Sequence, residues 1–133
     1  MPDCIFCKIV GRDIPNYTVY EDNHVLAFLD INPIAKGHTV LIPKVHAETV
    51  FDLNDELEKE LFPAIDHVMS ILQDKLSPDG FNVGWNHLGA GGQVVLHLHI
   101  HIIPRWDCDG GGNIHSVINN PGSVSVEDVA SKF

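Results

Sequence analysis

Long hydrophobic runs are missing from this chain of 133 residues. A membrane-spanning helix needs about 18 or more consecutive apolar residues, and no stretch of the sequence approaches that length. The N-terminus, MPDCIFCKIV, lacks the basic start and the long apolar stretch of a secretory signal peptide. Three cysteines are too few for the disulfide framework of a small secreted domain. We therefore expect a cytoplasmic protein without a membrane partner.

Positive charge is also scarce. Eight Lys and Arg stand against 18 Asp and Glu, which gives a formal net charge of −10 at pH 7. Because this charge repels polyanions, broad nucleic-acid binding is disfavoured. An anionic substrate would have to be attracted by a local site, since the net charge of the protein opposes its approach.

Apolar residues are present in sufficient number for one packed core. Hydrophobic residues make up 44% of the sequence, and we find neither an internal repeat nor a low-complexity segment. We therefore expect residues 1–133 to form a single domain. From Asp107 onward the sequence is rich in turn residues and weakly periodic. We expect residues 107–133 to be a C-terminal tail, with a short terminal helix over 126–133.

Alternating or aliphatic segments between turn signals predict about five strands. They lie at 17–22, 25–30, 38–43, 81–85 and 96–103. After the third strand, Asn54 is placed to cap a helix whose apolar residues recur at spacings of three and four as far as Leu76. Pro63 lies inside this helix and predicts a kink, or a second helix that begins at Pro63. Strands around one main helical segment, without regular βαβ alternation, indicate an α+β fold.

The last predicted strand carries the most unusual pattern, HLHIHII at 97–103. On a regular strand the three histidines share one face, and the aliphatic residues face a core, namely Leu96, Leu98, Ile100 and Ile102. A merely solvated face would carry Thr, Lys, Glu or Ser as readily as His. One metal ion bound by all three is disfavoured, because the outer two Cα atoms would be about 13 Å apart. We favour a division of labour, in which one histidine reacts and the others bind charge or metal.

This pattern resembles the signature of the histidine triad (HIT) superfamily, His-φ-His-φ-His-φ-φ with φ apolar, and the sequence is most similar to the Hint-like nucleoside phosphoramidase branch. Other landmarks keep the family's order and spacing: CIFCKIV at 4–10, Ile14-Pro15, VYED at 19–22, AFLDINP at 27–33, GHTVLIPKVH at 37–46 and Gly92-Gln93. The resemblance covers residues 4–105. It implies a HIT-like α+β fold with an antiparallel sheet of about five strands, assembled as a homodimer.

The resemblance also implies a phosphate site. In this family the middle histidine attacks the α-phosphate, so His99 would form a nucleotidyl-histidine that water then hydrolyses. His101 corresponds to the phosphate-side histidine, and His38 to an outlying histidine that packs behind the triad. Asn86 and Gln93 match phosphate-contacting positions. The Gly-rich loop at 89–93 can bring backbone amides close to an anion.

Two positions near this loop depart from the family pattern. Val94 stands where some relatives have a hydroxyl residue that helps to protonate the leaving group. Leu88 stands where those relatives often have Gly, and this makes the backbone conformation at residue 88 a point to test.

The nucleoside side is implied in the same way. Asp30 matches the carboxylate that receives hydrogen bonds from ribose hydroxyls, a role that suits a group that only accepts. The positions placed to line a purine pocket are Ile5, Phe6, Phe28 and Ile31. For each of these apolar residues, ordinary core packing is the competing interpretation.

Cys4 and Cys7 form a C-x-x-C pair with two interpretations. A redox pair usually lies at the start of a helix that follows a strand in a thioredoxin-like unit, and the sequence does not predict that context. The resemblance favours half of a zinc site, because some HIT proteins complete such a site with the histidine of a PKxH motif and the first triad histidine, here His46 and His97. Four protein ligands leave no open position, so the zinc would be structural.

Together these features imply an enzyme that binds a purine nucleotide and cleaves a nucleoside phosphoramidate, or a related conjugate, at the α-phosphorus to release a nucleoside monophosphate. Three alternatives stay open: a dinucleoside polyphosphate hydrolase of the same superfamily, a nucleotide-binding or scaffold protein with vestigial turnover, and a metal-dependent hydrolase. The complete triad favours an enzyme, because a pure binder needs no nucleophile at the middle position. The carboxylates that a metal-dependent hydrolase would need are absent from the triad motif.

Overall fold

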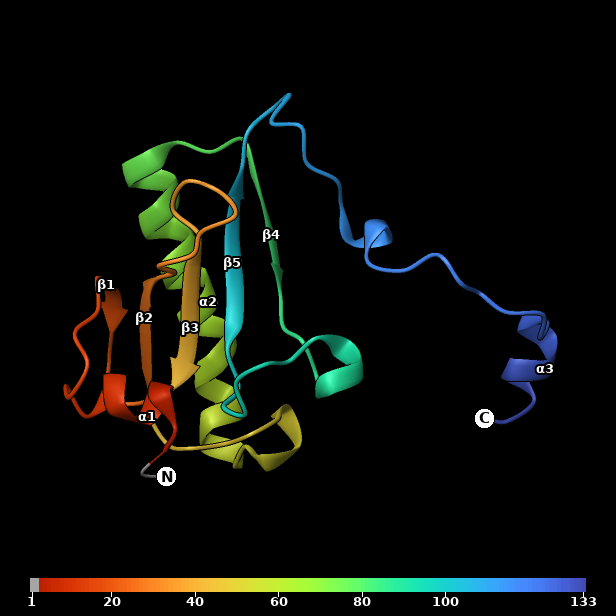
Figure 1. Ribbon diagram of the computed structural model, residues 1–133, viewed down its shortest axis with the longest axis horizontal. Helices are drawn as coiled ribbons and strands as arrows, with labels where there is room; N and C mark the ends of the chain where they lie inside the picture. The colour runs from red at the N-terminus through yellow and green to blue at the C-terminus, as the bar shows by residue number, and fades with distance from the viewer. Residues whose placement is uncertain (1–2) are drawn as a thin grey trace.

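A computed structural model describes residues 3–133 and places a five-stranded antiparallel sheet at the centre of the protein, with the strand order β1-β2-β3-β5-β4 (Figure 1). The strands are β1 (Thr18–Glu21), β2 (Val25–Leu29), β3 (Thr39–Pro43), β4 (Gly80–Gly84) and β5 (Ile100–Arg105). The helices are α1 (Ile5–Val10), α2 (Asp55–Leu76) and α3 (Val126–Ala130), with short 3-10 turns η1 (Val50–Asp52), η2 (Gly89–Gly91) and η3 (Ile114–Ser116). The predicted α+β class and the number of strands are confirmed.

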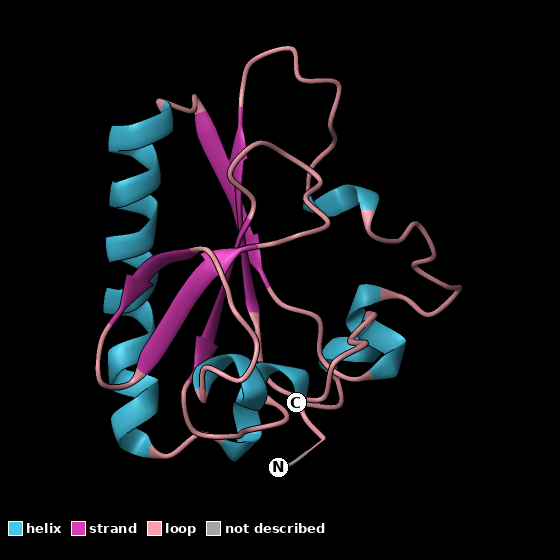
Figure 2. Cartoon of the chain, turned by 60° about the vertical axis from the view of Figure 1, so that its left-hand side comes forward, coloured by secondary structure: helices cyan, strands magenta, loops and turns pink. Residues whose placement is uncertain are grey.

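Helix α2 lies against one face of the sheet (Figure 2). Asn54 caps it, with its side-chain oxygen accepting a hydrogen bond from the Leu57 N–H at 2.9 Å. Its apolar stripe packs on the strands in a core made of Val25, Ala27, Leu41, Leu61, Ala64, Ile65, Val68, Leu72, Ile100 and Ile102. The alternative of a second helix beginning at Pro63 is wrong, because α2 is continuous through that residue. Pro63 is exposed, so water can satisfy the carbonyl that its ring leaves without a partner.

The opposite face of the sheet is covered in part by α1, a helix that the sequence analysis did not predict. Cys4 caps it, with its sulfur accepting from the Cys7 N–H at 3.4 Å. Ile9 packs on the strands in a second core cluster with Leu26, Phe28, Val40 and Ile42. Helix α1 thereby brings the C-x-x-C pair onto the sheet face that also carries His101, because His101 is paired with Val40 on β3.

The strand predicted at 96–103 is shifted in the structure, where β5 begins at Ile100 and continues to Arg105. Pairing with β3 covers only residues 100–102, so His97 and His99 lie in an irregular segment before the strand. The expectation that Leu96 faces the core is wrong, since 51% of it is exposed, whereas Leu98 is buried as predicted. An alternating sequence fits any extended backbone, and it does not reveal where the neighbouring strand stops.

Residues 107–133 are exposed throughout and lead away from the sheet to α3 (Figure 1). Before this tail departs, the Arg105 guanidinium binds the Asp109 carboxylate at 2.7 and 2.8 Å and the Gly112 carbonyl at 2.6 Å. These contacts hold the first part of the tail against the sheet. None of the helices between residues 3 and 133 combines the length and apolar character needed to cross a membrane.

Candidate active site and metal centre

The triad histidines lie along the segment that leads into β5, and of the three His101 is inside the strand. His97 is fully buried, His99 is 9% exposed and His101 is half-buried. The ring centroids of His99 and His101 are 5.2 Å apart. Phe6 of α1 places its ring against that of His99, with the centroids 5.1 Å apart. Helix α1 therefore meets the segment that precedes β5 at the middle histidine.

The hydrogen bond of His99 fixes which of its nitrogens can react. Its Nδ1 lies 2.7 Å from the backbone carbonyl oxygen of His97. A carbonyl oxygen only accepts hydrogen bonds, so Nδ1 carries the proton and donates. In the neutral ring, Nε2 is therefore left with a lone pair. A base or nucleophile at this position would act through Nε2.

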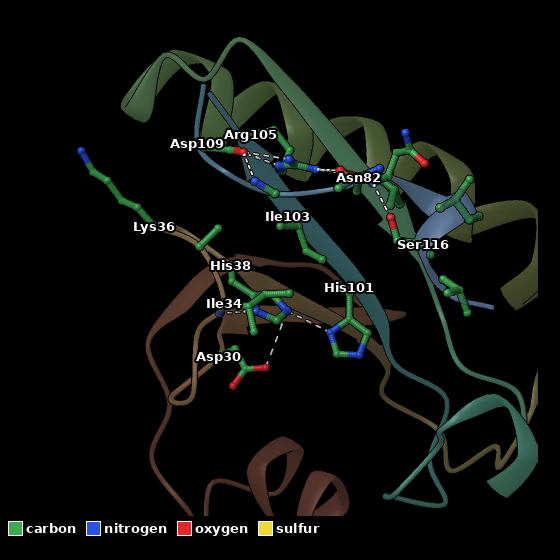
Figure 3. A pocket seen from close by; sticks show the side chains of 18 of the residues that line it. Asp30, Ile34, Lys36, His38, Asn82, His101, Ile103, Arg105, Asp109 and Ser116 are labelled. Carbon is green, nitrogen blue, oxygen red and sulfur yellow. Dashed lines mark hydrogen bonds and ion pairs between the residues drawn. The ribbon is translucent and has the colours of Figure 1, made fainter. Parts of the chain in front are cut away.

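A second chain of hydrogen bonds gives His101 the opposite tautomer (Figure 3). The Ile34 N–H donates to Nδ1 of His38 at 3.2 Å, so His38 carries its proton on Nε2. That N–H donates to Nδ1 of His101 at 2.9 Å. Neutral His101 therefore presents its Nε2–H as a donor. The base-like nitrogen of His99 and the donor N–H of His101 are chemically complementary.

Burial, followed by the neighbouring His99 and His38, lowers the pKa of His101 to about 4. Burial also lowers the pKa of His38, and Asp30 opposes this effect from 3.7 Å away. Both rings are consequently neutral at pH 7. At neutral pH this site offers directed hydrogen bonds to an anion, without a full positive charge from either ring.

Asp30, His38 and His101 place three metal-ligating atoms within 4.8 Å of one another. A metal on Nε2 of His38 would require the proton on Nδ1, where it would face the Ile34 N–H donor. Two N–H groups that face each other cannot form a hydrogen bond. The hydrogen bond from Ile34 to His38 therefore disfavours a metal ion between Asp30, His38 and His101.

A cleft of about 910 Å³ opens beside these residues, between the β4–β5 part of the sheet and residues 109–117. Four of the predicted site residues line it, namely Asp30, His38, Asn86 and His101. The Asp30 carboxylate also accepts a hydrogen bond from the Asn32 N–H at 2.8 Å, which fixes its orientation at the cleft. A carboxylate has further lone pairs, so Asp30 can still accept from a ligand.

The four apolar residues predicted for a purine pocket do not share one environment. Phe28 is 6% exposed and packs in the second core cluster, against the Phe6 ring at a centroid distance of 5.9 Å. Ile31 is 80% exposed and Ile5 is 47% exposed. Phe6, which contacts both Phe28 and His99, is the best placed of the four to meet a ligand at the triad.

Gln93 is buried and its side-chain amide is fully engaged by the backbone. Its Oε1 accepts from the Leu88 N–H at 2.8 Å, and its Nε2 donates to the carbonyls of Glu48 and Val95 at 2.8 and 3.0 Å. The predicted phosphate contact through this side chain is therefore not what the structure presents. Leu88 adopts φ 58° and ψ 179°, a conformation that favours glycine. Although residue 88 is Leu and not the Gly of some relatives, its backbone keeps the conformation that glycine favours.

The predicted metal ligands converge. The ligand atoms of Cys4, Cys7, His46 and His97 all lie within 4.8 Å of one another. Nδ1 of His97 is 3.4 Å from Sγ of Cys4 and 3.6 Å from Sγ of Cys7, and Nδ1 of His46 is 3.3 Å from Sγ of Cys7. A tetrahedral zinc with its usual bond lengths separates sulfur and nitrogen ligands by about 3.6 Å. The four residues therefore fit a metal ion of this kind.

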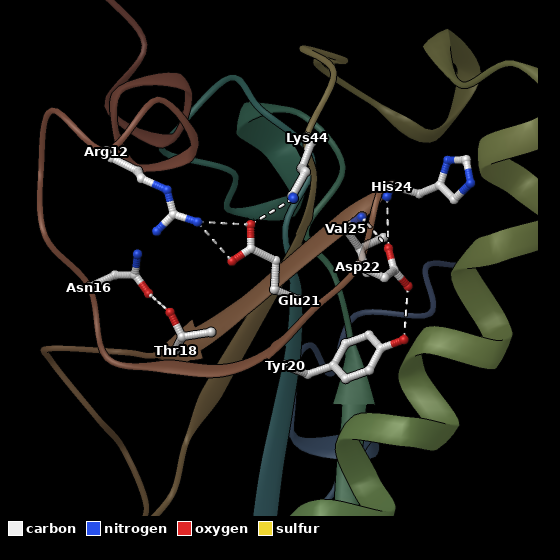
Figure 4. Close-up of polar contacts among 9 residues, drawn as sticks. All are labelled: Arg12, Asn16, Thr18, Tyr20, Glu21, Asp22, His24, Val25 and Lys44. Atoms are coloured by element: carbon white, nitrogen blue, oxygen red, sulfur yellow. Dashed lines mark hydrogen bonds and ion pairs between the residues drawn. The ribbon is translucent and has the colours of Figure 1, made fainter.

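Hydrogen bonding and burial both suit His97 to bind a metal through Nδ1. His97 donates from Nε2 to the Pro43 carbonyl at 2.8 Å, which leaves the Nδ1 lone pair directed at the sulfurs. Burial lowers the pKa of His97, and this favours the neutral form that a metal requires. His46 follows Lys44, whose ammonium binds Glu21 of β1 at 2.6 Å (Figure 4). Arg12 binds the same carboxylate at 3.3 Å, so the start of the segment that carries His46 is anchored to the sheet edge.

Comparison with known proteins agrees with this geometry. The HIT domain matches residues 11–107. The chain belongs to the HIT family. It is 50% identical to protein hit of Bacillus subtilis over 104 residues, which are 78% of this chain and 72% of that protein. It is 36% identical to adenylylsulfatase HINT3 of Arabidopsis thaliana over 107 residues, which are 80% of this chain and 54% of that protein.

Two solved structures extend the comparison to the fold. A HIT family protein from Bacillus subtilis superposes with a TM-score of 0.84 at 44% identity, and the match covers 98% of this chain and 92% of that chain. A zinc-bound histidine triad protein from Mycobacterium smegmatis superposes with a TM-score of 0.76 at 35% identity, and it covers 81% of this chain and 78% of that chain. Proteins of the HIT family are nucleotide hydrolases or transferases, and this chain is an enzyme of that class.

Three groups that shape the site were missed by sequence reasoning. The Ile34 N–H and the Pro43 carbonyl set the tautomers of His38 and His97, and Arg105 fixes the tail at the rim of the cleft. The first two are backbone groups, so their residue types carry no signal. Arg105 directly follows the triad strand, and its position between β5 and a turn-rich tail could have suggested an anchor.

Proposed function

We propose that this HIT enzyme cleaves purine nucleoside phosphoramidates, or related nucleotide conjugates, at the α-phosphorus through a nucleotidyl-histidine. The observation that carries the proposal is the 2.7 Å hydrogen bond from Nδ1 of His99 to the His97 carbonyl, which leaves a lone pair on Nε2. Nε2 attacks phosphorus, the bond from phosphorus to the leaving nitrogen breaks, and that nitrogen departs as a neutral amine with a proton taken from solvent. Water then displaces His99 and gives a proton back to solvent, so that the nucleoside monophosphate leaves and the neutral imidazole is regenerated.

His101 supports the transferring phosphate in this mechanism. Its Nε2–H is a neutral donor because His38 donates to its other nitrogen. Such a donor strengthens its hydrogen bond as negative charge develops on the phosphate oxygens, and it needs no rearrangement to do so. In the proposal Asn86 adds a contact at the same cleft, while Asp30 receives the ribose hydroxyls and Phe6 meets the base.

The preferred substrate class rests on the chemistry of the leaving group. Val94 offers no hydroxyl to protonate a leaving atom, so a leaving group that departs easily or carries its own proton is favoured. The relative from Arabidopsis is named an adenylylsulfatase, and adenylylsulfate is likewise an adenylyl conjugate with a good leaving group. A dinucleoside polyphosphate is the competing substrate, and the assay below includes it.

The test is a rapid-quench experiment with an adenosine phosphoramidate labelled in the adenosine portion. We expect label on the protein in a linkage that is stable to alkali and lost in acid, and peptide mapping should place it on the segment that contains His99. His99→Ala should lose both label and turnover by several orders of magnitude. His101→Ala should turn over slowly but still accept label. Robust hydrolysis by His99→Ala would refute the mechanism, and faster use of diadenosine polyphosphates would refute the substrate class.

We also propose that the cluster of Cys4, Cys7, His46 and His97 binds one structural zinc ion. The ligand distances and the tautomer of His97 support this, and a zinc-bound protein is among the similar structures. When bound, the ion would cross-link α1 to the segment before β5. With four protein ligands it has no open position for substrate. The homodimer, the single domain over 1–133 and the cytoplasmic location stay predictions from the sequence.

A further inference from the structure

We propose that Gln93 is a positioning residue that holds the segment carrying His99 in its reactive place, through three hydrogen bonds from its buried side chain. The inference rests on the proposed role of His99 as the nucleophile. It replaces the phosphate contact that the sequence suggested for Gln93.

The need for such a residue follows from where β5 begins. His97 and His99 precede Ile100, the first residue of the strand, and therefore lack ladder pairing. The backbone there is attached instead to the connection after β3, with the Leu98 N–H donating to the Ala47 carbonyl at 2.7 Å. The orientation of His99 depends on this segment, because its Nδ1 donates to the His97 carbonyl.

Gln93 joins the three stretches of chain that meet at this segment. Its Nε2 donates to Glu48, next to Ala47, and to Val95, two residues before His97. Its Oε1 accepts from Leu88 at the start of the Gly-rich loop. The side chain is only 7% exposed, and its loss would remove the partner of one backbone donor and of two backbone acceptors.

The conformation of Leu88 shows that the loop needs this restraint. A residue with a Cβ at φ 58° and ψ 179° is strained, and such strain persists only where the surroundings enforce it. The bond from the Leu88 N–H to Gln93 is one such restraint. The Leu88 carbonyl accepts from the N–H groups of Gly91 and Gln93 at 3.1 and 3.0 Å, which closes the loop on itself.

The experiment compares Gln93→Ala and Gln93→Glu with Gln73→Ala. Gln73 is a matched control, because its Nε2 also braces a turn, by donating to the Pro78 carbonyl at 3.1 Å, at the end of α2. In the Glu variant the carboxylate can still accept from Leu88, but it has no N–H for Glu48 and Val95. Steady-state kinetics with an adenosine phosphoramidate are measured together with amide hydrogen exchange at Leu88 and Leu98.

We expect both Gln93 variants to lose about 100-fold in kcat with little change in KM, because a misplacement of roughly 1 Å at the reacting atom costs about that factor. Exchange at Leu98 should become faster in both variants, and exchange at Leu88 in the Ala variant. Adding Leu88→Gly to Gln93→Ala should raise kcat again by roughly tenfold, since glycine adopts the loop conformation without strain. Gln73→Ala should change neither kcat nor the exchange at these two amides.

Two results would overturn the inference. A raised KM with unchanged amide exchange would return Gln93 to a direct phosphate contact. Wild-type kcat in folded Gln93→Ala would show that the segment needs no such restraint. A failure of the proposed function can be distinguished from these two results, because the wild-type protein would then carry no label on His99.

Discussion

The unusual pKa of His101 predicts a specific loss of stability in acid. In the folded protein this pKa is lowered from 6.5 to about 4, chiefly by burial. In the unfolded chain the ring titrates at its ordinary value, so between pH 6.5 and 4 the unfolded state binds more protons than the folded state. The stabilisation that depends on neutral His101 is therefore complete above about pH 6.5, and it is lost as the pH falls through this window.

The magnitude follows from the two pKa values. Integrating the linkage relation gives a loss of about 2 kcal/mol by pH 5 and about 3 kcal/mol below pH 4. Since a small domain is stable by only about 5–15 kcal/mol, either loss is readily measured. Because His101 is partly exposed, solvent screening makes these values upper limits.

The assay is urea unfolding of the wild type and of His101→Asn between pH 8 and pH 4.5. Asparagine cannot titrate, but its side-chain oxygen can still accept from the Nε2–H of His38. We expect the wild type to lose up to about 2 kcal/mol more than the variant between pH 8 and pH 5. Acid effects at the Cys and His cluster are common to both proteins and cancel in the difference. Parallel pH profiles for the two proteins would refute the assignment of a neutral, half-buried donor at residue 101.

Three further predictions concern other parts of the site. Metal analysis of protein purified without chelator should show about one zinc per chain, and Cys4→Ala should lower the stability more than the chemical rate; freely titratable thiols without zinc would exclude the structural metal. Asp30→Ala should impair ribonucleotide substrates more than 2′-deoxynucleotides, because the lost acceptor serves a ribose hydroxyl; equal impairment would remove Asp30 from the ribose site. Leu88→Gly should stabilise the protein against urea by about 1 kcal/mol, the relief of roughly 1–3 kcal/mol of strain less the entropy cost of glycine; a destabilised variant would show that Leu88 is not strained.

The sheet and the main helix could be predicted because their signals are local. The cap at Asn54 and the spacing of apolar residues up to Leu76 define α2 within its own sequence, and the structure agrees with both ends. Helix α1 was missed because it has only six residues, too few for a convincing period. Its stability comes from packing on the sheet, which no local pattern reports.

The sequence motifs point to the residue types of the candidate site, but they do not give its geometry. The triad motif and the C-x-x-C pair single out His99 and Cys4 as candidates, whereas the tautomers depend on backbone groups that are distant in sequence. Pro43 lies 54 residues before its partner His97, and the carbonyl it supplies would be the same on any residue. Gln93 is a case in which the residue type suggested the wrong contact. Its side chain was expected to contact phosphate, but its Oε1 and Nε2 are bonded to backbone groups.

His97 explains why a metal cluster and a reactive histidine can be neighbours without mixing their chemistry. Its Nδ1 lies beside Sγ of Cys4 and its Nε2–H donates to the Pro43 carbonyl, while its own backbone carbonyl accepts a hydrogen bond from Nδ1 of His99. One residue thus contacts the cluster through its side chain and His99, the proposed nucleophile, through its backbone. A displacement of His97 would therefore move the carbonyl that orients His99, which lies only two residues further along the chain. A regular alternation in HLHIHII would place these histidines on one face, and the irregular backbone before Ile100 is what allows the rings of His97 and His99 to face different partners.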